Sequence, residues 1–292
     1  METLGNAVRR ASRALEAAGW DPPSAYLDAE VLARAMLGID LAAWLARQGE
    51  RADHAFQRAF DDAVARRLRY EPVAYIVGER EFYGRSFRVS PAVLIPRPET
   101  ELVVDEALAA AAVSHADGRA VQDVADVGTG SGVLAVTLAL ELPDTHVAAT
   151  DVSSAALAVA AANVDRFHLA ARVTLEHAAL LGDRRGAFDL VVSNPPYVAA
   201  RDRAQLMPDV RDYEPGVALF GGADGLDVIR ALLPAATRAL RPGGWLVMEL
   251  GAGQSAVAAG MLEESTGLSL VRIAHDLADI PRVVVARRYG EP

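Results

Sequence analysis

The segment Asn194-Pro195-Pro196-Tyr197 follows an apolar run that is typical of a buried strand. Two consecutive prolines remove two backbone donors and fix two φ angles, so this turn is expected to be rigid. The side-chain oxygen of Asn194 and the carbonyl of Pro195 can accept the two N–H groups of an amide or an exocyclic amine. Tyr197 can lie against the plane of such a group. Held in this way, the nitrogen directs its lone pair at an electrophilic methyl group, and no general base is needed. A purely structural loop is the alternative.

A glycine-rich turn, Gly128-Thr129-Gly130-Ser131-Gly132, stands between an expected strand and an expected helix. Glycines let a ligand approach the backbone closely, and the amide groups at a helix start point outward. Asp151 ends the next expected strand, roughly 20 residues further on, where a carboxylate can accept hydrogen bonds from ribose hydroxyls. The pattern favours a nucleoside-containing cofactor. Without a ligand, the same residues would form a tight turn, with Asp151 capping the following helix together with Ser153 and Ser154.

The composition excludes several kinds of functional site. The chain has 292 residues, of which 52% are hydrophobic and 23% are charged, so it can bury a sizeable core. All 29 cationic residues are Arg and there is no Cys, which excludes disulfides, Cys-based metal sites and Lys Schiff bases. The six His residues lack metal-ligand spacing, so no metal is expected. The net charge of −10 argues against a large surface for nucleic acid or membrane.

The elements that must position these residues follow from periodicity and turn signals. Residues 3–69 have helical spacing throughout, with Ser24, Asp40 and Asp53 as expected caps. Residues 73–80 and 86–90 read as a hairpin, and Thr100 is expected to cap a helix that runs to about residue 112. Further helices are expected at residues 133–140, 155–163 and 226–240. Strands are expected at residues 121–127, 146–150, 173–177, 189–193, 245–250, 268–274 and 282–287.

This alternation predicts an α/β fold, with a doubly wound and mostly parallel sheet whose last two strands are antiparallel. The expected parts are a helical domain at 1–71, a β-hairpin linker at 72–92, and an α/β domain at 93–292. The N-terminus has no signal-peptide pattern, so the protein is expected to be cytoplasmic.

The glycine-rich turn and the acidic strand end resemble those of class I S-adenosylmethionine-dependent methyltransferases. That resemblance implies a seven-stranded sheet and S-adenosyl-L-methionine as cofactor. In such enzymes the glycine turn passes beside the amino-acid part of the cofactor and the acidic residue holds the ribose. Carried over by position, these roles fall to Gly128, Thr129, Gly130, Ser131, Gly132 and Asp151.

Several segments together resemble the family of peptide-chain release factor glutamine methyltransferases, also called PrmC/HemK. They are Pro72–Gly78, Glu81–Gly84, Val93–Glu101, Asn194–Tyr197 and Glu214–Asp227. The resemblance implies methylation of the Gln in the Gly-Gly-Gln motif of class I release factors. It implies catalytic roles for Asn194, Pro195 and Tyr197, and substrate contacts for these residues and for Pro196, Arg97 and Glu99.

The resemblance also implies that the N-terminal helices and the hairpin help to dock the release factor. Glu214 would stiffen the far side of the cleft, and Arg97 and Glu99 could instead simply pair with each other. A monomer without membrane or nucleic-acid partners is expected.

One position departs from the family. In that family, an Asp followed by a large apolar residue or Trp usually stands beside the cofactor's adenine, but Ala178 and Ala179 occupy the matching positions here. Loss of that side-chain hydrogen bond predicts weaker cofactor binding, by about 0.5–1.5 kcal/mol, with backbone contacts at Ala179 remaining. Two other functions stay open: an adenine N6-methyltransferase acting on nucleic acid, and a catalytically weakened binding protein.

Overall fold

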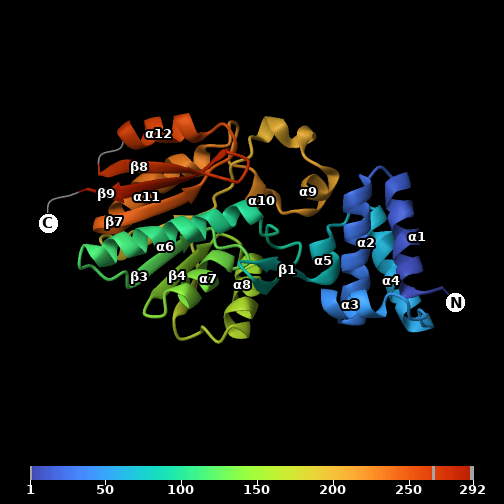
Figure 1. Ribbon diagram of the computed structural model, residues 1–292. Coiled ribbons are helices and arrows are strands. Elements are labelled where there is room, and N and C mark those ends of the chain that lie inside the picture. Colours follow the sequence, from blue (N-terminus) through green and yellow to red (C-terminus); the bar gives the residue numbers. More distant parts are fainter. Residues whose placement is uncertain (1, 265–266, 290–292) are drawn as a thin grey trace. The chain divides into compact units, whose positions relative to one another are not determined.

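The computed structural model describes residues 2–264 and 267–289, and these form two compact units (Figure 1). Residues 2–79 and Met207–Tyr213 make up unit 1. Residues 80–206, together with the described residues from Glu214 onward, make up unit 2. None of the described helices combines the length and the apolar character that crossing a bilayer requires.

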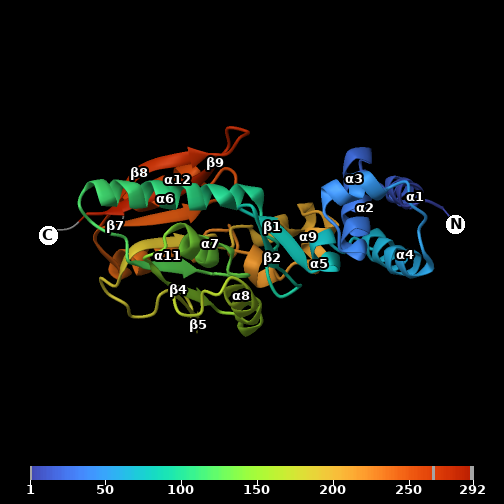
Figure 2. The same cartoon turned by 60° about the horizontal axis from the view of Figure 1, so that its bottom comes forward.

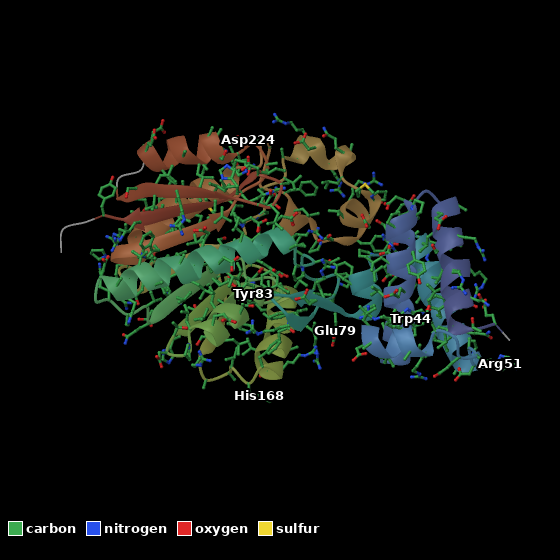
Figure 3. All side chains as sticks on the ribbon, in the orientation of Figure 1. Trp44, Arg51, Glu79, Tyr83, His168 and Asp224 are labelled. Atoms are coloured by element: carbon green, nitrogen blue, oxygen red, sulfur yellow. The ribbon has the colours of Figure 1, made fainter. Side chains whose placement is uncertain are left out.

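Unit 1 is helical and has a core of its own. Its helices are α1 (Leu4–Ala17), α2 (Pro22–Leu37), α3 (Leu41–Arg47), α4 (His54–Leu68), α5 (Val73–Val77) and α9 (Pro208–Tyr213). The side chains of Asp40 and Asp53 cap α3 and α4, as the sequence predicted. The expected cap at Ser24 is wrong, because α2 begins earlier and Asp21 accepts the amide of Ser24 instead. Trp44 is fully buried in the core of this unit (Figure 3).

The hairpin is shorter than the sequence predicted. Its strands are β1 (Glu79–Phe82) and β2 (Arg85–Arg88). Residues Val73–Val77, expected to be extended, instead form α5, because Pro72 starts a helical turn and Gly78 ends it at a left-handed φ of 82°. Strand β2 is held to the rest of unit 2 by the buried side chain of Asn163. This amide accepts from Arg88 N at 2.8 Å and donates to Arg88 O at 3.0 Å.

Unit 2 is built on a seven-stranded sheet in the order β5-β4-β3-β6-β7-β9-β8. Its strands are β3 (Asp123–Val127), β4 (His146–Asp151), β5 (Val173–His177), β6 (Phe188–Ser193), β7 (Leu240–Glu249), β8 (Leu268–His275) and β9 (Pro281–Arg288). The first five in chain order pair in parallel, and β9 is antiparallel to both β7 and β8. The expected doubly wound sheet is therefore confirmed, with the antiparallel pair at its end.

Helices cover both faces of this sheet (Figure 2). Along β3 and β6, successive residues alternate between two buried clusters, as the two-residue period of a strand requires. One cluster includes α6 (Glu101–Ala116), α7 (Val133–Glu141) and α8 (Ser154–Arg166), and the other includes α11 (Asp227–Ala239) and α12 (Ser255–Glu264). Helix α12 was not expected from the sequence, and neither were the short helices η1 (Pro98–Thr100), η2 (Ala200–Gln205) and α10 (Gly216–Leu219).

Candidate active site

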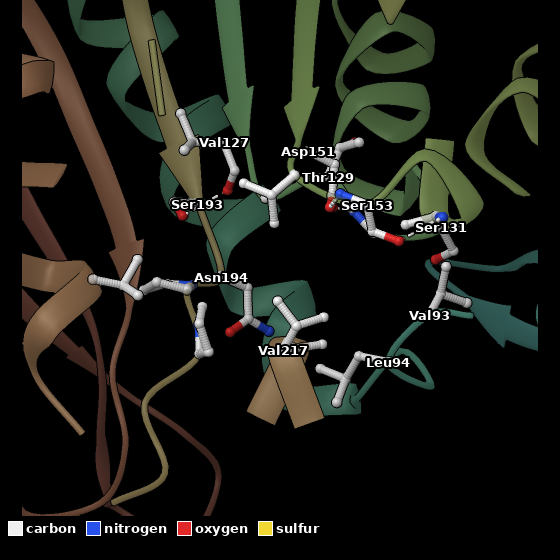
Figure 4. Close-up of a pocket in the computed structure, with 18 of the residues that line it drawn as sticks. Val93, Leu94, Val127, Thr129, Ser131, Asp151, Ser153, Ser193, Asn194 and Val217 are labelled. Carbon is white, nitrogen blue, oxygen red and sulfur yellow. Dashed lines mark hydrogen bonds between the residues drawn. The ribbon is translucent and has the colours of Figure 1, made fainter. Parts of the chain in front are cut away.

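A cavity of about 500 Å³ lies in unit 2 where β3, β4 and β6 end. These strands are parallel neighbours, so their carboxyl ends meet at one edge of the sheet, where such folds place ligands. Figure 4 shows Ser131, Asp151 and Ser153 on one side of the cavity, with Ser193 and Asn194 on another. The two sequence motifs predicted to act together therefore line the same cavity.

The glycine-rich turn follows β3 and is held against β4. The amides of Gly128 and Thr129 both donate to the carbonyl of Thr150 at 2.9 Å. Gly128 and Gly130 have left-handed φ angles of 73° and 55°, with open space where a Cβ would stand, so a ligand can reach the backbone here. Gly132 has a different role. A Cβ there would meet the Cβ of Ala160 at 3.3 Å, so this glycine lets α8 pack closely.

The carboxylate of Asp151 is fixed by two backbone amides. Its Oδ2 accepts from Gly130 N at 2.9 Å and its Oδ1 accepts from Ser153 N at 2.8 Å. The cap of α8 is Ser153, whose side chain accepts from Ala156 N at 3.1 Å. Asp151 therefore orients the turn and keeps further lone pairs that can accept hydroxyl donors from a ligand.

Asp126 supports the same turn from inside the core, a role that the sequence analysis missed. Its Oδ2 accepts from Thr129 Oγ1 at 2.6 Å and from Ala135 N at 3.1 Å. Its Oδ1 is buried without a hydrogen-bond partner in the described part of the chain. Burial raises the pKa of Asp126 to about 7, against the lowering effect of these two hydrogen bonds. An Asp two residues before the first glycine of the turn, within an apolar strand, was the available signal.

The Asn-Pro-Pro-Tyr turn follows β6 and is tied to a buried carboxylate. Asn194 lines the cavity, and its Nδ2 donates to Thr100 Oγ1 at 3.0 Å. The Thr100 hydroxyl donates to Glu249 Oε2 at 2.6 Å, and the Tyr197 hydroxyl donates to Glu249 Oε1 at 3.2 Å. Glu249 was not predicted from the sequence, and the predicted capping role of Thr100 is wrong. The Thr100 side chain makes no cap to α6.

Close backbone contacts brace this turn from behind. A Cβ at Gly221 would lie 2.3 Å from the carbonyl oxygen of Pro196, and a Cβ at Gly225 would lie 2.2 Å from that of Tyr197. Gln254 Nε2 also donates to the Tyr197 carbonyl, at 3.0 Å. The turn is therefore held by its own prolines and by a glycine loop that permits no side chain at these contacts.

The loop before α6 contributes the remaining predicted residues. Arg97 pairs with Glu214 at 2.5 Å, so the suggested pairing of Arg97 with Glu99 is not the one that forms. Glu214 Oε2 also accepts from Ile95 N at 3.2 Å, which fixes the loop beside the cavity wall. Within the described chain, the cavity lining includes Pro195 and Pro196 but not Arg97, Glu99, Gly132 or Tyr197.

Ala178 and Ala179 follow β5 and line the cavity together with Val152 and Leu180. This wall offers apolar side chains and backbone groups, which suit the face of a planar base. The residues present thus fit the expected S-adenosyl-L-methionine. The glycine turn allows close backbone approach, Asp151 can meet ribose hydroxyls, and the volume lies in the range of small-molecule sites, roughly 300–1,000 Å³.

Comparison with protein families identifies both parts of the chain. A model of the PrmC N-terminal domain matches residues 6–78, and a model of the methyltransferase small domain matches residues 103–209. A release factor glutamine methyltransferase of Koribacter versatilis is 43% identical over 290 residues, covering 98% of this chain and 99% of that protein. One from Geobacter sulfurreducens is 44% identical over 267 residues, covering 90% of each.

Solved structures agree on the fold. The hMettl16 catalytic domain in complex with MAT2A 3′UTR hairpin 6 matches with a TM-score of 0.56 at 18% identity, over 79% of this chain and 83% of that chain. A methyltransferase from Pyrococcus furiosus matches with a TM-score of 0.53 at 19% identity, over 79% of this chain and 100% of that chain. At such identities the likeness establishes the class I methyltransferase fold and nothing about the substrate.

Proposed function

This chain belongs to the family of release factor glutamine methyltransferases, and from that premise we propose its reaction and its site. It transfers a methyl group from S-adenosyl-L-methionine to the side-chain amide nitrogen of the Gln in the Gly-Gly-Gln motif of class I release factors. The observation that carries this proposal is the shared cavity, in which Asn194 and Pro195 face the same space as the glycine turn and Asp151.

In this proposal the glycine turn, Asp151 and the backbone at Ala179 hold the cofactor. When bound, S-adenosyl-L-methionine supplies an electrophilic methyl group on a sulfonium. Asn194 Oδ1 and the Pro195 carbonyl accept the two N–H groups of the glutamine amide and aim its lone pair. The nitrogen would gain the methyl group while the methyl–sulfur bond of the bound cofactor breaks and its electron pair stays on sulfur as a neutral thioether. The surplus proton on the nitrogen then leaves to water, so no residue acts as a strong base.

The rate then depends on positioning. Well-oriented reactants gain about 7–11 kcal/mol from pre-arranged geometry, and a stiff turn is the element that provides it. Pro196 and Tyr197 complete the substrate side of this turn. Arg97 and Glu99, which lie outside the cavity lining in the described chain, contact the release factor further from the reacting nitrogen.

We further propose that residues 1–71 and the hairpin linker dock the release factor, and that residues 93–292 carry the reaction. The protein acts in the cytoplasm as a monomer and requires no nucleic acid. Its net charge of −10 supports a protein substrate over a polyanion.

The test is methyl transfer from labelled S-adenosyl-L-methionine to three acceptors. They are an intact release factor, the same factor with its Gly-Gly-Gln glutamine changed to Glu, and an adenine-containing oligonucleotide. Mass spectrometry should locate one methyl group on that glutamine, and the other two acceptors should stay unlabelled. Label on the oligonucleotide, or none on the intact factor, would overturn the proposal.

A further inference from the structure

When Glu249 is ionised, the hydrogen bonds around it have a fixed direction. Glu249 is 1% exposed, and an ionised carboxylate can only accept hydrogen bonds. Its Oε2 accepts a hydrogen bond from Thr100 Oγ1 at 2.6 Å. Because the Thr100 hydroxyl proton is used in that bond, Thr100 Oγ1 can only accept a hydrogen bond from Asn194. Asn194 then has to turn its Nδ2 donor toward Thr100, at 3.0 Å. The chain of bonds therefore runs from Asn194 through Thr100 to Glu249.

This direction decides which end of the Asn194 amide faces the cavity. The two ends of an Asn side chain are nearly the same size, and sterics alone do not choose between them. With Nδ2 bound to Thr100, Oδ1 has no hydrogen-bond partner within the described residues and is left for a ligand. The opposite orientation would direct an NH2 donor at the N–H groups of the substrate, which need acceptors.

We propose that Glu249 and Thr100 are positioning residues for methyl transfer, which act by fixing Asn194 with its oxygen toward the substrate amide. This inference rests on the proposed function. It adds Thr100, which lines the cavity beside Asn194, and the buried Glu249, and it gives both a role in orienting the Asn194 amide. Tyr197 belongs to the same network, because its hydroxyl donates to the other oxygen of Glu249 at 3.2 Å.

The groups facing Glu249 make this orientation sensitive to pH. Thr100 and Tyr197 donate hydrogen bonds to it, Glu99 adds a like charge, and Arg282 on β9 adds an opposite one that is shared with Asp276. Burial outweighs the two hydrogen bonds and Arg282, and raises the pKa of Glu249 to about 7. A protonated Glu249 is a donor and no longer requires the Thr100 hydroxyl to point toward it, so the amide orientation is released.

Variants that keep the shape and change the hydrogen bonds test this proposal. Thr100→Val removes the hydroxyl that links Asn194 to Glu249. It should lower kcat by about 100-fold, the scale expected when a reacting group is misplaced. Thr100→Ser keeps the hydroxyl and should restore most of the rate. Thr137→Val is the matched control, because the Thr137 hydroxyl is buried in α7 without a partner in the described chain. It should leave kcat unchanged.

The pH profile separates positioning from structural support. For the wild type, kcat should rise with pH as Glu249 ionises, with a midpoint at about pH 7. Glu249→Gln should have a low kcat without this rise. At about pH 5, where Glu249 is uncharged in the folded protein, the cofactor affinity and the unfolding midpoint of this variant should stay close to those of Thr137→Val. Wild-type kcat in Thr100→Val, or the same pH midpoint in Glu249→Gln, would overturn the proposal.

A second readout does not depend on turnover. The side-chain NH2 signals of Asn194, assigned with Asn194→Asp, should shift with pH in the wild type and stay constant in Glu249→Gln. If this shift is found while the release factor remains unmethylated, the proposed function fails and the positioning network stands. If the signals do not respond to pH in the wild type, the network is wrong whatever the substrate is.

Discussion

Asn194 combines two demands on one side chain, since its Nδ2 is bound to Thr100 while its Oδ1 is assigned to the substrate. Asn194→Ala removes both contacts. We expect kcat for release-factor methylation to fall by about 10²–10³, or about 2.7–4 kcal/mol in the barrier, as for loss of one preorganised donor in an active site. Single-turnover kinetics with saturating cofactor measure this fall. A variant that keeps a near-normal rate would remove Asn194 from the mechanism.

Asp151 is placed for cofactor binding more than for the chemical step. Asp151→Ala removes acceptors from Gly130 N and Ser153 N as well as from the ribose hydroxyls. Each charged hydrogen bond is worth about 1.5–3 kcal/mol, so we expect the Kd for S-adenosyl-L-methionine to rise by at least about tenfold. Isothermal titration calorimetry measures this directly. Unchanged affinity would show that the ribose is held elsewhere.

The alanines at 178 and 179 allow a complementary measurement. Ala178→Asp and Ala179→Asp each place a carboxylate on the cavity wall that we assign to the adenine. One of the two should tighten cofactor binding by about 0.5–1.5 kcal/mol, the worth of a single added hydrogen bond. Isothermal titration calorimetry measures the cofactor Kd of each variant. Equal or weaker binding in both variants would mean that backbone groups already make the hydrogen bonds of the adenine.

At the scale of elements, the glycine loop behind the Asn-Pro-Pro-Tyr turn determines where that turn lies. Gly225→Ala places a methyl group 2.2 Å from the Tyr197 carbonyl oxygen at a φ of 81°. Gly118→Ala is a matched control, because Gly118 has a φ of 75° and open space around the added carbon. Gly118→Ala should lose about 1–2 kcal/mol of stability from the left-handed backbone, and Gly225→Ala should lose more because its methyl group also clashes with backbone. Only Gly225→Ala should also lose methyl transfer, and equal activity in the two variants would contradict the bracing role.

The sequence predicted elements well where the signal was local. The strand before Asn194 ends at two prolines, and β3 ends at a glycine turn, so both sides of the cavity were anticipated. The prediction failed where a residue far away in the sequence determines the role of a side chain. Thr100 resembles a helix cap, but its hydroxyl is bound to Glu249, which lies 149 positions away. Residues Val73–Val77 resemble a strand because of their β-branched side chains, and only the flanking Pro72 and Gly78 indicate a helical turn.

At the scale of the whole molecule, buried carboxyl groups predict how stability depends on pH. The pKa values of Asp126 and Glu249 are both raised to about 7 by burial. Between their unfolded values and about 7 the folded state holds more protons, so the stability present at lower pH is lost as the pH rises. We expect the urea midpoint of the cofactor-free protein to decrease as the pH is raised from about 5 to about 7. Asp126→Asn should weaken this fall, and a midpoint that rises with pH would contradict the assignment.

The two units have separate buried cores, which predicts a divided response to the cofactor. At 100 times its Kd, S-adenosyl-L-methionine should stabilise the unit that binds it by about 2.7 kcal/mol. Hydrogen-exchange mass spectrometry should therefore show protection in unit 2, strongest near the cavity, and little change in α1, α2 and α4. Equal protection in both units would mean that they open as one body.

The Asn163 amide has one more neighbour, because its Nδ2 also donates to the carbonyl of Ser131 at 2.8 Å. One short side chain thus joins strand β2 of the hairpin to the cofactor turn. A docked protein that displaces β2 would therefore also displace that turn, through the hydrogen bonds of Asn163. Thermodynamic reciprocity then requires the cofactor and the docked protein to alter each other's affinity by the same factor. The enzyme with bound cofactor and the enzyme without it would therefore bind the protein substrate with different affinities.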